Sequence, residues 1–524
     1  MKRGVKPSWS GLRARAARTW AGNRLFIIVL IPAALLRLDA ELGYRWQAWF
    51  NDSFQYVQNT VTLNLDPTRV SGYSLWLKLF QVFHTYAIIT ILQHLMGLAT
   101  AVMIYALARH RFRVPAWVAT LATLPLLYDG FGIQLEHLIL SDIPFLFVLV
   151  LAVTLLLWDP QPSMRRCLVI GALLGVDDLL RSVALPLLAV FAVYMIIRRI
   201  SWKRVAAAIV VCLLPVFAYA GAFEIQHGQF AMTDSTGVFL YSRVMTFADC
   251  DKMGKIPASE LFLCDATPPA KRPIAQAYIW TSPSPLDRMT PAKFSPAPNQ
   301  LAEKFAIQAI EAQPLSYAKA VFDDIWRVFA WKRTVFPQAA TYDEYLFGYH
   351  SLPIPTWDQA ALGPYDSYAS AYVHGNALTQ VVAPFANVIR GYQRYVWLPG
   401  TVYGLILLAG LGGMVLAWRR LGGEALLPWT ISLALIVIPA ATAEFDYRYV
   451  LVAVPFACLA AALAFAPGTA GGDLAGRLAG RLPGRKRRED GSADDAGVLP
   501  VPDKSSAGAR GAGHDQGDLA ADGT

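Results

Sequence analysis

The chain has 524 residues, of which 55% are hydrophobic and 16% are charged, and its mean hydropathy is +0.38. Soluble globular domains carry about 25% charged residues, so this composition predicts an integral membrane protein and excludes an ordinary soluble one. The net charge of +9 does not indicate a nucleic-acid partner, because the basic residues cluster beside apolar segments, as the positive-inside rule predicts for cytoplasmic loops.

The amino terminus is strongly basic. Residues 1–24 contain seven Lys and Arg and no acidic residue. Since no small-residue cleavage site follows the first apolar segment, we expect a retained membrane span and not a cleaved signal peptide. The basic segment 1–24 should then lie in the cytoplasm.

Apolar segments recur along the chain, each near the ~20 residues that a bilayer requires. They predict an all-α membrane protein with about ten transmembrane helices. Basic residues gather in alternate loops, which places both termini in the cytoplasm and the loops 39–85, 129–137, 224–396 and 444–448 outside. The expected spans are 25–38, 86–108, 115–128, 138–158, 166–180, 182–199, 204–223, 397–417, 424–443 and 449–466.

One outer segment, 224–396, is long enough for a separate domain. We expect a mixed extracytoplasmic domain there, inserted between a membrane domain at 25–223 with about seven helices and the last three spans at 397–466. Its proline-rich centre predicts turns and extended loop. Residues 301–331 instead show helical apolar spacing that is interrupted at Pro314, which predicts two short amphipathic helices.

The carboxyl-terminal segment 467–524 is rich in Gly, Ala, Asp and Arg and has almost no aromatic residues. Such a segment cannot bury enough apolar area to offset its ordering entropy. We therefore expect a disordered cytoplasmic tail.

The five cysteines divide by location. Cys167, Cys212 and Cys458 lie in expected spans, where a buried thiol is usually a small apolar side chain. Cys250 and Cys264 lie in the outer segment, where an oxidising compartment lets a disulfide persist. The alternative is two free thiols, and a catalytic role is disfavoured because no histidine lies near them in sequence.

Two carboxylates differ from the many acidic residues that solvated loops explain. Asp52 lies in WFNDSFQY (49–56) among aromatic side chains and precedes no obvious helix with apolar periodicity. Asp142 lies at the head of the apolar helix expected after LSDIPFLF (140–147). It could be a plain helix cap there, because the helix dipole favours a carboxylate at this end. We select both as candidate catalytic residues.

The order of features resembles the C-type glycosyltransferase superfamily, in particular the bacterial relatives of protein mannosyltransferases and lipid A aminoarabinose transferases. The resemblance covers about residues 25–466 and rests on WFNDSFQY, GYSLWLKLF, LSDIPFLF and FDYRYVLVAVPF. Many relatives carry paired acids in the first outer loop, whereas here Asn51 precedes the single Asp52. That departure concerns the subclass more than the superfamily.

This resemblance implies transfer of a sugar from a polyprenyl-phosphate donor to a glycan, lipid or protein acceptor, with inversion, at the outer face of the bacterial plasma membrane. Asp52 would serve as base or hydrogen-bond anchor for the acceptor hydroxyl. The leaving lipid phosphate needs cationic or donor groups. The candidates to bind it are Arg448 and Arg243, the leading pair, with Arg69, Lys78 and Arg181.

These cations also have plain alternatives. Arg448 could merely neutralise Asp446 or Glu444, and Arg181 could pair with Asp177 or Asp178. Lys78 could extend to the membrane interface without any ligand.

Metal binding has little support in the sequence. Glu136, His137 and Asp142 are close along the chain, but their spacing matches no compact ligand set, and His84, His94 and His137 favour structural roles. We expect no required cofactor, although a divalent ion that bridges carboxylate and phosphate stays open as an alternative. No nucleotide-binding fingerprint stands out, so a lipid-linked donor is favoured.

Two other classes of function stay open. A transporter or flippase for a lipid-linked sugar would often show internal repeats and broken helices, and we find no repeat. A non-catalytic membrane-anchored interaction protein would fit if Asp52 and Asp142 lay far apart. The enzyme hypothesis requires both carboxylates to line one site.

Overall fold

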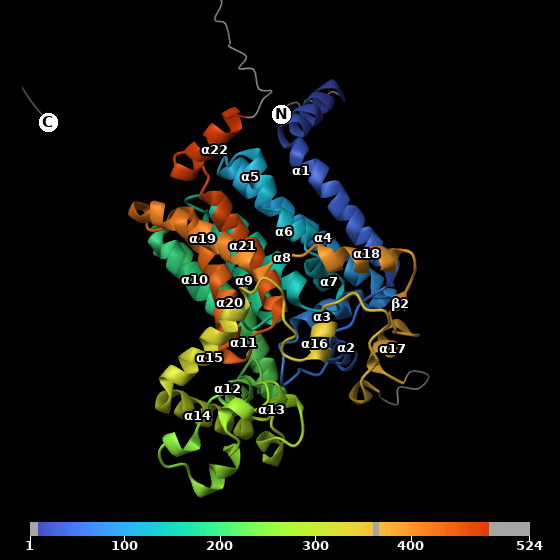
Figure 1. Ribbon diagram of the computed structural model, residues 1–524, viewed down its shortest axis with the longest axis vertical. Helices are drawn as coiled ribbons and strands as arrows, with labels where there is room; N and C mark the ends of the chain where they lie inside the picture. Colours follow the sequence, from blue (N-terminus) through green and yellow to red (C-terminus); the bar gives the residue numbers. More distant parts are fainter. Residues whose placement is uncertain (1–8, 360–365, 482–524) are drawn as a thin grey trace, which may run out of the picture. The chain divides into compact units, whose positions relative to one another are not determined.

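The computed structural model describes residues 9–359 and 366–481 and is almost entirely helical (Figure 1). Within these residues the strands are β1 (Tyr44–Arg45) and β2 (Gln380–Val381), which pair antiparallel. The long apolar helices are α1 (Trp9–Gly43), α4 (Ala87–Ala106), α8 (Asp142–Trp158), α9 (Met164–Leu180), α10 (Ala184–Ile197), α11 (Trp202–His227), α19 (Gly400–Leu416), α20 (Leu426–Thr442) and α21 (Tyr447–Leu463).

The remaining helices lie between or after them. They are α2 (Asn51–Thr62), α3 (Gly72–Phe80), α5 (Ala116–Leu121), α6 (Leu124–Tyr128), α7 (Gly130–His137), α12 (Thr236–Val244), α13 (Ala277–Trp280), α14 (Pro296–Ala312), α15 (Pro314–Arg327), α16 (Ala339–Asp343), α17 (Tyr368–Val373), α18 (Phe385–Tyr395) and α22 (Ala470–Arg481). A π-helical turn lies at Leu107–Arg111, and 3-10 turns lie at Gln81–Phe83, Cys250–Lys252, Ala258–Leu263, Pro269–Lys271, Pro285–Arg288, Thr356–Asp358, Trp418–Arg420 and Gly423–Ala425.

Each of the expected spans contains apolar helix, but fewer helices than expected reach the length of a bilayer. Among the described residues, the helices long and apolar enough to cross are Ala87–Arg111, Trp202–His227 and Gly423–Thr442. Two bent pairs raise the number to five if each pair is one span: α5–α6 with α7, bent by 55°, and α18 with α19, bent by 61°. These helices support a multi-pass membrane protein, and the number ten stays a prediction.

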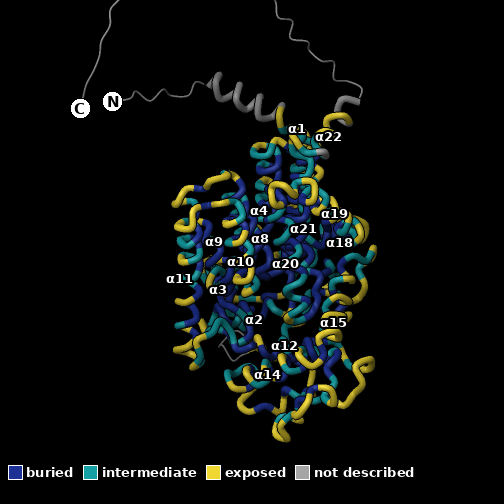
Figure 2. Tube along the Cα trace, turned by 90° about the vertical axis from the view of Figure 1, so that its left-hand side faces the viewer, coloured by how far each residue is buried: buried dark blue, intermediate teal, exposed yellow. Residues whose placement is uncertain are grey.

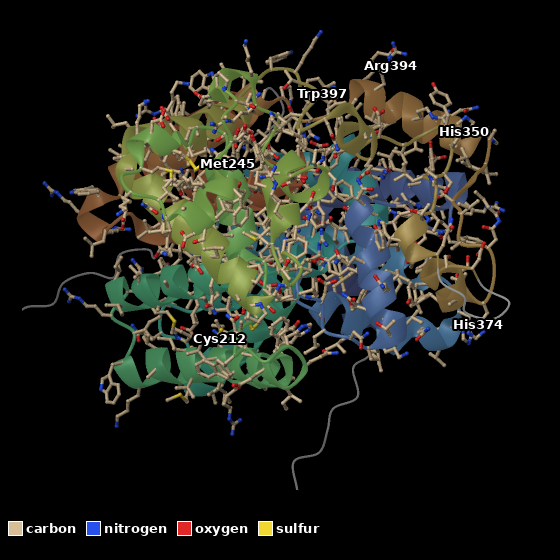
Figure 3. All side chains as sticks on the ribbon, turned by 90° about the horizontal axis from the view of Figure 1, so that it is seen from below. Cys212, Met245, His350, His374, Arg394 and Trp397 are labelled. Carbon is tan, nitrogen blue, oxygen red and sulfur yellow. A yellow bond between two sulfur atoms is a disulfide. The ribbon has the colours of Figure 1, made fainter. Side chains whose placement is uncertain are left out.

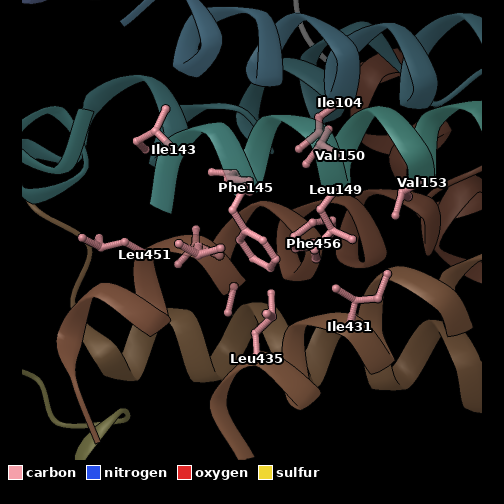
Figure 4. Close-up of a cluster of buried hydrophobic side chains, with 14 of the residues drawn as sticks. Ile104, Ile143, Phe145, Leu149, Val150, Val153, Ile431, Leu435, Leu451 and Phe456 are labelled. Atoms are coloured by element: carbon pink, nitrogen blue, oxygen red, sulfur yellow. The ribbon is translucent and has the colours of Figure 1, made fainter. Parts of the chain in front are cut away.

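The centre of the helical bundle is formed by α8, α20 and α21. Helix α21 packs on α19 and α20, and α8 packs on α4 and α9. Figure 2 shows the buried part of the trace concentrated in these central helices. Phe145 and Leu149 of α8 meet Phe456 of α21 and Leu435 of α20 there (Figure 4). Because lipid is as apolar as leucine, tight packing of this kind holds helices together in a membrane.

Helices α9 and α11 approach each other closely because α9 presents two glycines one turn apart. A Cβ atom at Gly171 would lie 2.3 Å from the carbonyl oxygen of Ala208, and one at Gly175 would lie 2.6 Å from that of Cys212. No larger residue fits against the α11 backbone at these positions. The pair follows the small-xxx-small spacing that lets membrane helices pack backbone to backbone.

The first part of the segment 224–396 has an apolar core of its own. Helix α12 packs on α14, with the ring of Tyr241 5.4 Å from that of Phe305. Pro314 separates α14 from α15, so the predicted break between two helices is confirmed. Helices α12 and α14 lie at the end of the bundle opposite the start of α1 in both views (Figures 1 and 2). The position of this part outside the membrane stays a prediction.

The second part of the segment leaves that core and returns to the bundle. Helix α17 packs on α2, and α18 packs on α1. Figure 3 places Met245, which follows α12, on the opposite side of the view from His350 and His374. The segment 224–396 therefore contributes both a small core and a cover for the loop 39–85.

The cysteines lie as expected. Cys250 and Cys264 form a disulfide with their Cα atoms 6.1 Å apart, which confirms that pairing. Cys167, Cys212 and Cys458 are buried free thiols.

The start of the carboxyl-terminal segment differs from the prediction. We expected disorder from residue 467, but the structure contains α22 (Ala470–Arg481). The hydroxyl of Thr469 accepts a hydrogen bond from the Gly472 backbone N–H at 3.0 Å, which caps the first turn of the helix. Composition alone could not show this local cap. Residues 482–524 of the expected tail lie outside the described residues.

The α9–α11 contact predicts unequal effects of two matched substitutions. Gly171→Ala should destabilise the protein by about 1–3 kcal/mol, because the added methyl group meets backbone. Gly221→Ala on α11 is the control, since a Cβ there would meet no described heavy atom within 4 Å. Thermal unfolding in detergent measures both, and equal melting temperatures would contradict the packing described.

The disulfide predicts the pattern of thiol labelling. A membrane-impermeant maleimide should label neither Cys250 nor Cys264 in intact cells until a reductant is added, because both sulfurs are bonded. Cys250→Ser should leave Cys264 open to labelling without reductant. Mass spectrometry of the labelled peptides reads the result, and labelling of both thiols in the unreduced parent would show that the bond is absent.

Candidate active site

Asp52 lies in the first turn of α2, a helix that the sequence analysis did not expect. The Phe50 backbone N–H donates to the Ser53 hydroxyl at 2.9 Å, which opens the helix at Asn51. Phe54 and Val57 are buried on its inner face. The apolar spacing is short, so it did not stand out beside the long membrane segments. The helix fixes the backbone from which the Asp52 side chain extends.

The Asp52 carboxylate is held between two guanidinium groups. Arg69 Nη2 donates to its Oδ1 at 2.6 Å, and Arg448 Nη1 donates to its Oδ2 at 2.8 Å. Its side chain is only 13% exposed. Burial alone would raise the pKa of Asp52, but the charges of Arg69 and Arg448 outweigh burial and hold this pKa well below its usual range. The carboxylate is therefore ionised and already accepts two charge-assisted hydrogen bonds.

Asp142 is fully buried at the start of α8 and faces Arg181, with which it forms a close ion pair. The alternative that Arg181 pairs with Asp177 or Asp178 is wrong for its side chain. Apart from the contact of Arg181 with Oδ1, no group in the described part of the chain donates to the Asp142 carboxylate. Asp142 is thus a buried carboxylate with lone pairs still available.

The two carboxylates belong to one site. The ring of Tyr449 has the guanidinium of Arg181 5.3 Å from its centroid and that of Arg448 5.5 Å from it. The Asp52 and Asp142 ion pairs therefore lie next to each other around this ring. That both carboxylates act in one catalytic site stays a prediction.

Hydrogen bonds fix the elements that carry these charges. The hydroxyls of Tyr56 and Ser141 lie 3.1 Å apart and join α2 to the start of α8. Asp66 accepts the backbone N–H of Arg69 at 3.2 Å and so shapes the loop that delivers this arginine. The loop and the helices thus hold the charged groups in place before any ligand binds.

Two further carboxylates border Asp52. Asp446 lies 3.0 Å from Nε of Arg448, so Arg448 pairs with both Asp52 and Asp446. Burial raises the pKa of Asp446 to about 6. Glu344 accepts the Asn51 backbone N–H at 3.2 Å, and burial raises its pKa to about 8. Burial therefore raises the pKa of Asp446 and Glu344, whereas the arginines lower the pKa of the neighbouring Asp52.

Two of the predicted phosphate-binding residues lie in other surroundings. Arg243 donates to Asp324 at 2.9 Å, with both side chains buried between α12 and α15. Lys78 donates to Gln81 at 2.8 Å at the end of α3. The structure does not bring either residue to Asp52, because each finds a partner on a neighbouring element.

Arg333 is a cation that the sequence analysis missed. Its guanidinium lies 3.9 Å from the ring centroid of Phe131 and 5.3 Å from that of Tyr447, and its side chain is 10% exposed. Asp129 is 3.9 Å away. The run WKRTVF (331–336) places a basic pair among aromatic residues, which is the signal that could have indicated this position.

An apolar cavity of about 420 Å³ extends from this region between α5–α6 and α19–α21. Asp129 and Leu398 line both this cavity and a smaller one that contains Arg333 and Tyr447. The apolar side chains that line the large cavity include Val118, Leu121, Tyr128, Trp397, Ile406 and Phe465.

No protein family and no curated protein matches the sequence. Among solved structures, the chain is similar to the archaeal oligosaccharyltransferase AglB from Archaeoglobus fulgidus in complex with an inhibitory peptide and a dolichol-phosphate, with 13% identity and a TM-score of 0.40. That match covers 88% of this chain and 52% of the other, so the chain spans about half the length of AglB.

A second similarity is to ArnT from Cupriavidus metallidurans bound to undecaprenyl phosphate, with 14% identity and a TM-score of 0.32. It covers 89% of this chain and 81% of that one. Both proteins are membrane glycosyltransferases of the C-type superfamily that the sequence resembles. Because these TM-scores lie below 0.5, the function proposed below rests on the geometry of the site.

Proposed function

We propose that the protein is an integral-membrane glycosyltransferase that moves a sugar from a polyprenyl-phosphate donor to an acceptor hydroxyl at the outer face of the bacterial plasma membrane. One observation carries the proposal. Arginines from three separate segments, Arg69, Arg181 and Arg448, converge on the two carboxylates Asp52 and Asp142 around the ring of Tyr449. Such a set can bind a phosphate and an acceptor hydroxyl side by side.

The arginines suit the leaving group. When the sugar departs, negative charge develops on the lipid phosphate, and guanidinium groups stabilise it with charge-assisted hydrogen bonds. The guanidinium groups of Arg181 and Arg448 lie 5.3 Å and 5.5 Å from the ring centroid of Tyr449. A bound phosphate could contact both guanidinium groups and replace part of their pairing with Asp52 and Asp142. In this scheme the arginines neutralise the phosphate, and no cofactor is assigned to the reaction.

The carboxylates suit the acceptor. Its hydroxyl oxygen attacks the anomeric carbon from the face opposite the phosphate, a new carbon–oxygen bond forms, and the bond to the phosphate oxygen breaks with its electron pair. The hydroxyl proton passes to a carboxylate. The low pKa of Asp52 makes it a weak base, so we assign it to anchoring the acceptor and holding the arginines. Asp142, whose Oδ2 has no partner among the described residues, is assigned the proton.

The apolar cavity of about 420 Å³ suits the lipid. Its walls are aliphatic and aromatic, which a polyprenyl chain can contact without leaving polar groups unsatisfied. Arg333 lines the smaller cavity, which also contains Tyr447 and shares Asp129 and Leu398 with the large one. We assign the isoprenoid units nearest the phosphate to the large cavity. The acceptor, a glycan, a lipid or a protein, would enter from the side of α2 and Glu344.

The first test distinguishes the role of Asp52 from that of Arg448. Asp52→Asn should lower sugar transfer by about 100-fold or more, a typical scale for loss of an acid–base or anchoring group. Its binding of lipid phosphate should persist, because Arg69 and Arg448 lose a competing anion. Arg448→Gln should weaken lipid-phosphate binding as well as turnover.

The assay uses the purified full chain in nanodiscs with a polyprenyl-phosphate sugar and follows the release of polyprenyl phosphate by mass spectrometry. Undecaprenyl phosphate alone measures binding. A stably folded Asp52→Asn variant with the parental rate would overturn the role of Asp52. In sealed proteoliposomes, transfer of intact donor across the membrane without release of polyprenyl phosphate would instead favour the transporter or flippase.

A second test concerns the lipid site. Arg333→Gln should weaken binding of undecaprenyl phosphate by about 10-fold, the scale of one lost charge-assisted hydrogen bond. Lys332→Gln is the matched control, because Lys332 is its neighbour in sequence and is exposed. Equal affinities of the two variants would exclude Arg333 from the lipid-phosphate site.

A further inference from the structure

A second cluster of titratable side chains is buried outside the candidate active site. Glu41 near the end of α1, His94 of α4 and His137 at the end of α7 each offer one atom within 4.8 Å of the others. Nε2 of His94 lies 3.1 Å from Nδ1 of His137, and Oε1 of Glu41 lies 3.7 Å and 3.8 Å from these nitrogens. The three residues are 8%, 4% and 0% exposed.

In each imidazole, the nitrogen that points away from the other ring already has a hydrogen-bond partner. Nε2 of His137 lies 2.7 Å from the Tyr44 carbonyl oxygen, which can only accept, so this nitrogen carries the proton and Nδ1 presents a lone pair. Nδ1 of His94 lies 2.8 Å from Oε2 of Glu136. Arg37 holds Glu136 as a carboxylate with contacts of 2.7 and 2.8 Å. His94 therefore donates outward and can present its Nε2 lone pair inward.

This arrangement leaves three acceptors facing one another. A proton on Nε2 of His94 would bridge the two rings, but it would leave the Glu41 carboxylate without a donor. Among the described residues, no donor meets hydrogen-bond geometry with either oxygen of Glu41, and the neighbouring Thr90 hydroxyl donates to the Trp46 carbonyl oxygen at 3.0 Å. An unsatisfied buried carboxylate is costly. A divalent cation at the centre satisfies both imidazoles and the carboxylate together.

We propose that Glu41, His94 and His137 bind a Zn²⁺ ion. Two imidazoles and one carboxylate form a donor set that zinc accepts, with water in the fourth position, whereas calcium and magnesium prefer oxygen ligands alone. Zinc bonds of 2.0–2.1 Å in tetrahedral geometry place ligand atoms about 3.3 Å apart, close to the distances given above. A carboxylate and a carbonyl orient the two rings from behind, as is usual for zinc-bound histidines.

A glycine in α4 allows the close contact between His94 and Glu136. A Cβ atom at Gly97, one turn after His94, would lie 2.1 Å from Oε1 of Glu136. Only glycine lets α4 bring His94 against the Glu136 carboxylate. The Arg37–Glu136 pair and the glycine thus fix His94 independently of the other two ligands.

The ion would position the active site without touching it. The Ala48 N–H donates to the His137 carbonyl oxygen at 3.0 Å, and the Ile139 N–H donates to the Ala48 carbonyl oxygen at 3.2 Å. The stretch that leads to Asp52 is therefore paired with the stretch that leads to Asp142. Zinc bound by Glu41 and His137 would tie the start of both stretches to α4.

Metal analysis of the full-length protein tests the proposal. The chain is purified in detergent with a peptide tag that binds no metal and without a chelator. Elemental mass spectrometry should then find about one Zn²⁺ per chain. Glu41→Gln and His137→Gln should each lose most of it. His350→Ala should keep it, since His350 is exposed at the edge of the view in Figure 3.

A measurement on the parent protein covers the case in which the variants fail to fold. X-ray absorption at the zinc edge should show nitrogen and oxygen ligands at about 2.0–2.1 Å with imidazole scattering and no sulfur near 2.3 Å. A folded parent chain without metal, another metal in its place, a sulfur ligand, or zinc retained in both variants would overturn the proposal. No readout uses a sugar donor, so failure of the metal site and failure of the proposed transferase are distinguished.

Discussion

The structure depends on one carboxylate held between guanidinium groups from distant parts of the chain. Asp52 meets Arg69, 17 residues away, and Arg448, 396 residues away. The second contact requires the start of α21 to lie against the start of α2, which closes the chain on itself. The charges occupy the ends of α2, α8, α9 and α21 and not their middles, where an ionised group in a membrane costs most.

Buried charges in this protein fall into two kinds. Arg37 lies within the first expected span, but its guanidinium contacts both oxygens of Glu136 and the carbonyl oxygens of Ala33, Leu126 and Leu127. A pair satisfied in this way has no capacity left for a ligand, and breaking it would cost about 3–5 kcal/mol. Arg181 and Asp142 lack such a set of contacts. Incomplete satisfaction, more than burial, distinguishes the residues available for chemistry.

The sequence could predict what local pattern determines. Apolar length indicated the helices, and Pro314 marked the break between α14 and α15. Asp52 stood out by its aromatic neighbours, and Asp142 by its place at the head of an apolar segment. The sequence could not show which arginines lie at the candidate site. Arg243 and Arg181 look alike in sequence, and only the folded chain shows that one meets Asp324 and the other meets Asp142. The histidine cluster was hidden for the same reason, since its members come from three helices.

The return of the chain over α2 has a consequence for how such a protein could change during evolution. Glu344 receives the Asn51 backbone N–H, and the Ala377 carbonyl oxygen accepts from the side chains of Gln47 and Trp49 at 2.6 and 3.0 Å. Buried side chains hold the cover as well, since the Tyr372 hydroxyl donates to the Leu77 carbonyl oxygen at 2.9 Å. The arginines and aspartates of the candidate site come from other segments. The exposed residues of the cover can vary without moving Asp52 or Asp142. Substitutions in this cover could therefore change which acceptor is bound during evolution, while Asp52, Asp142 and their arginines stay the same.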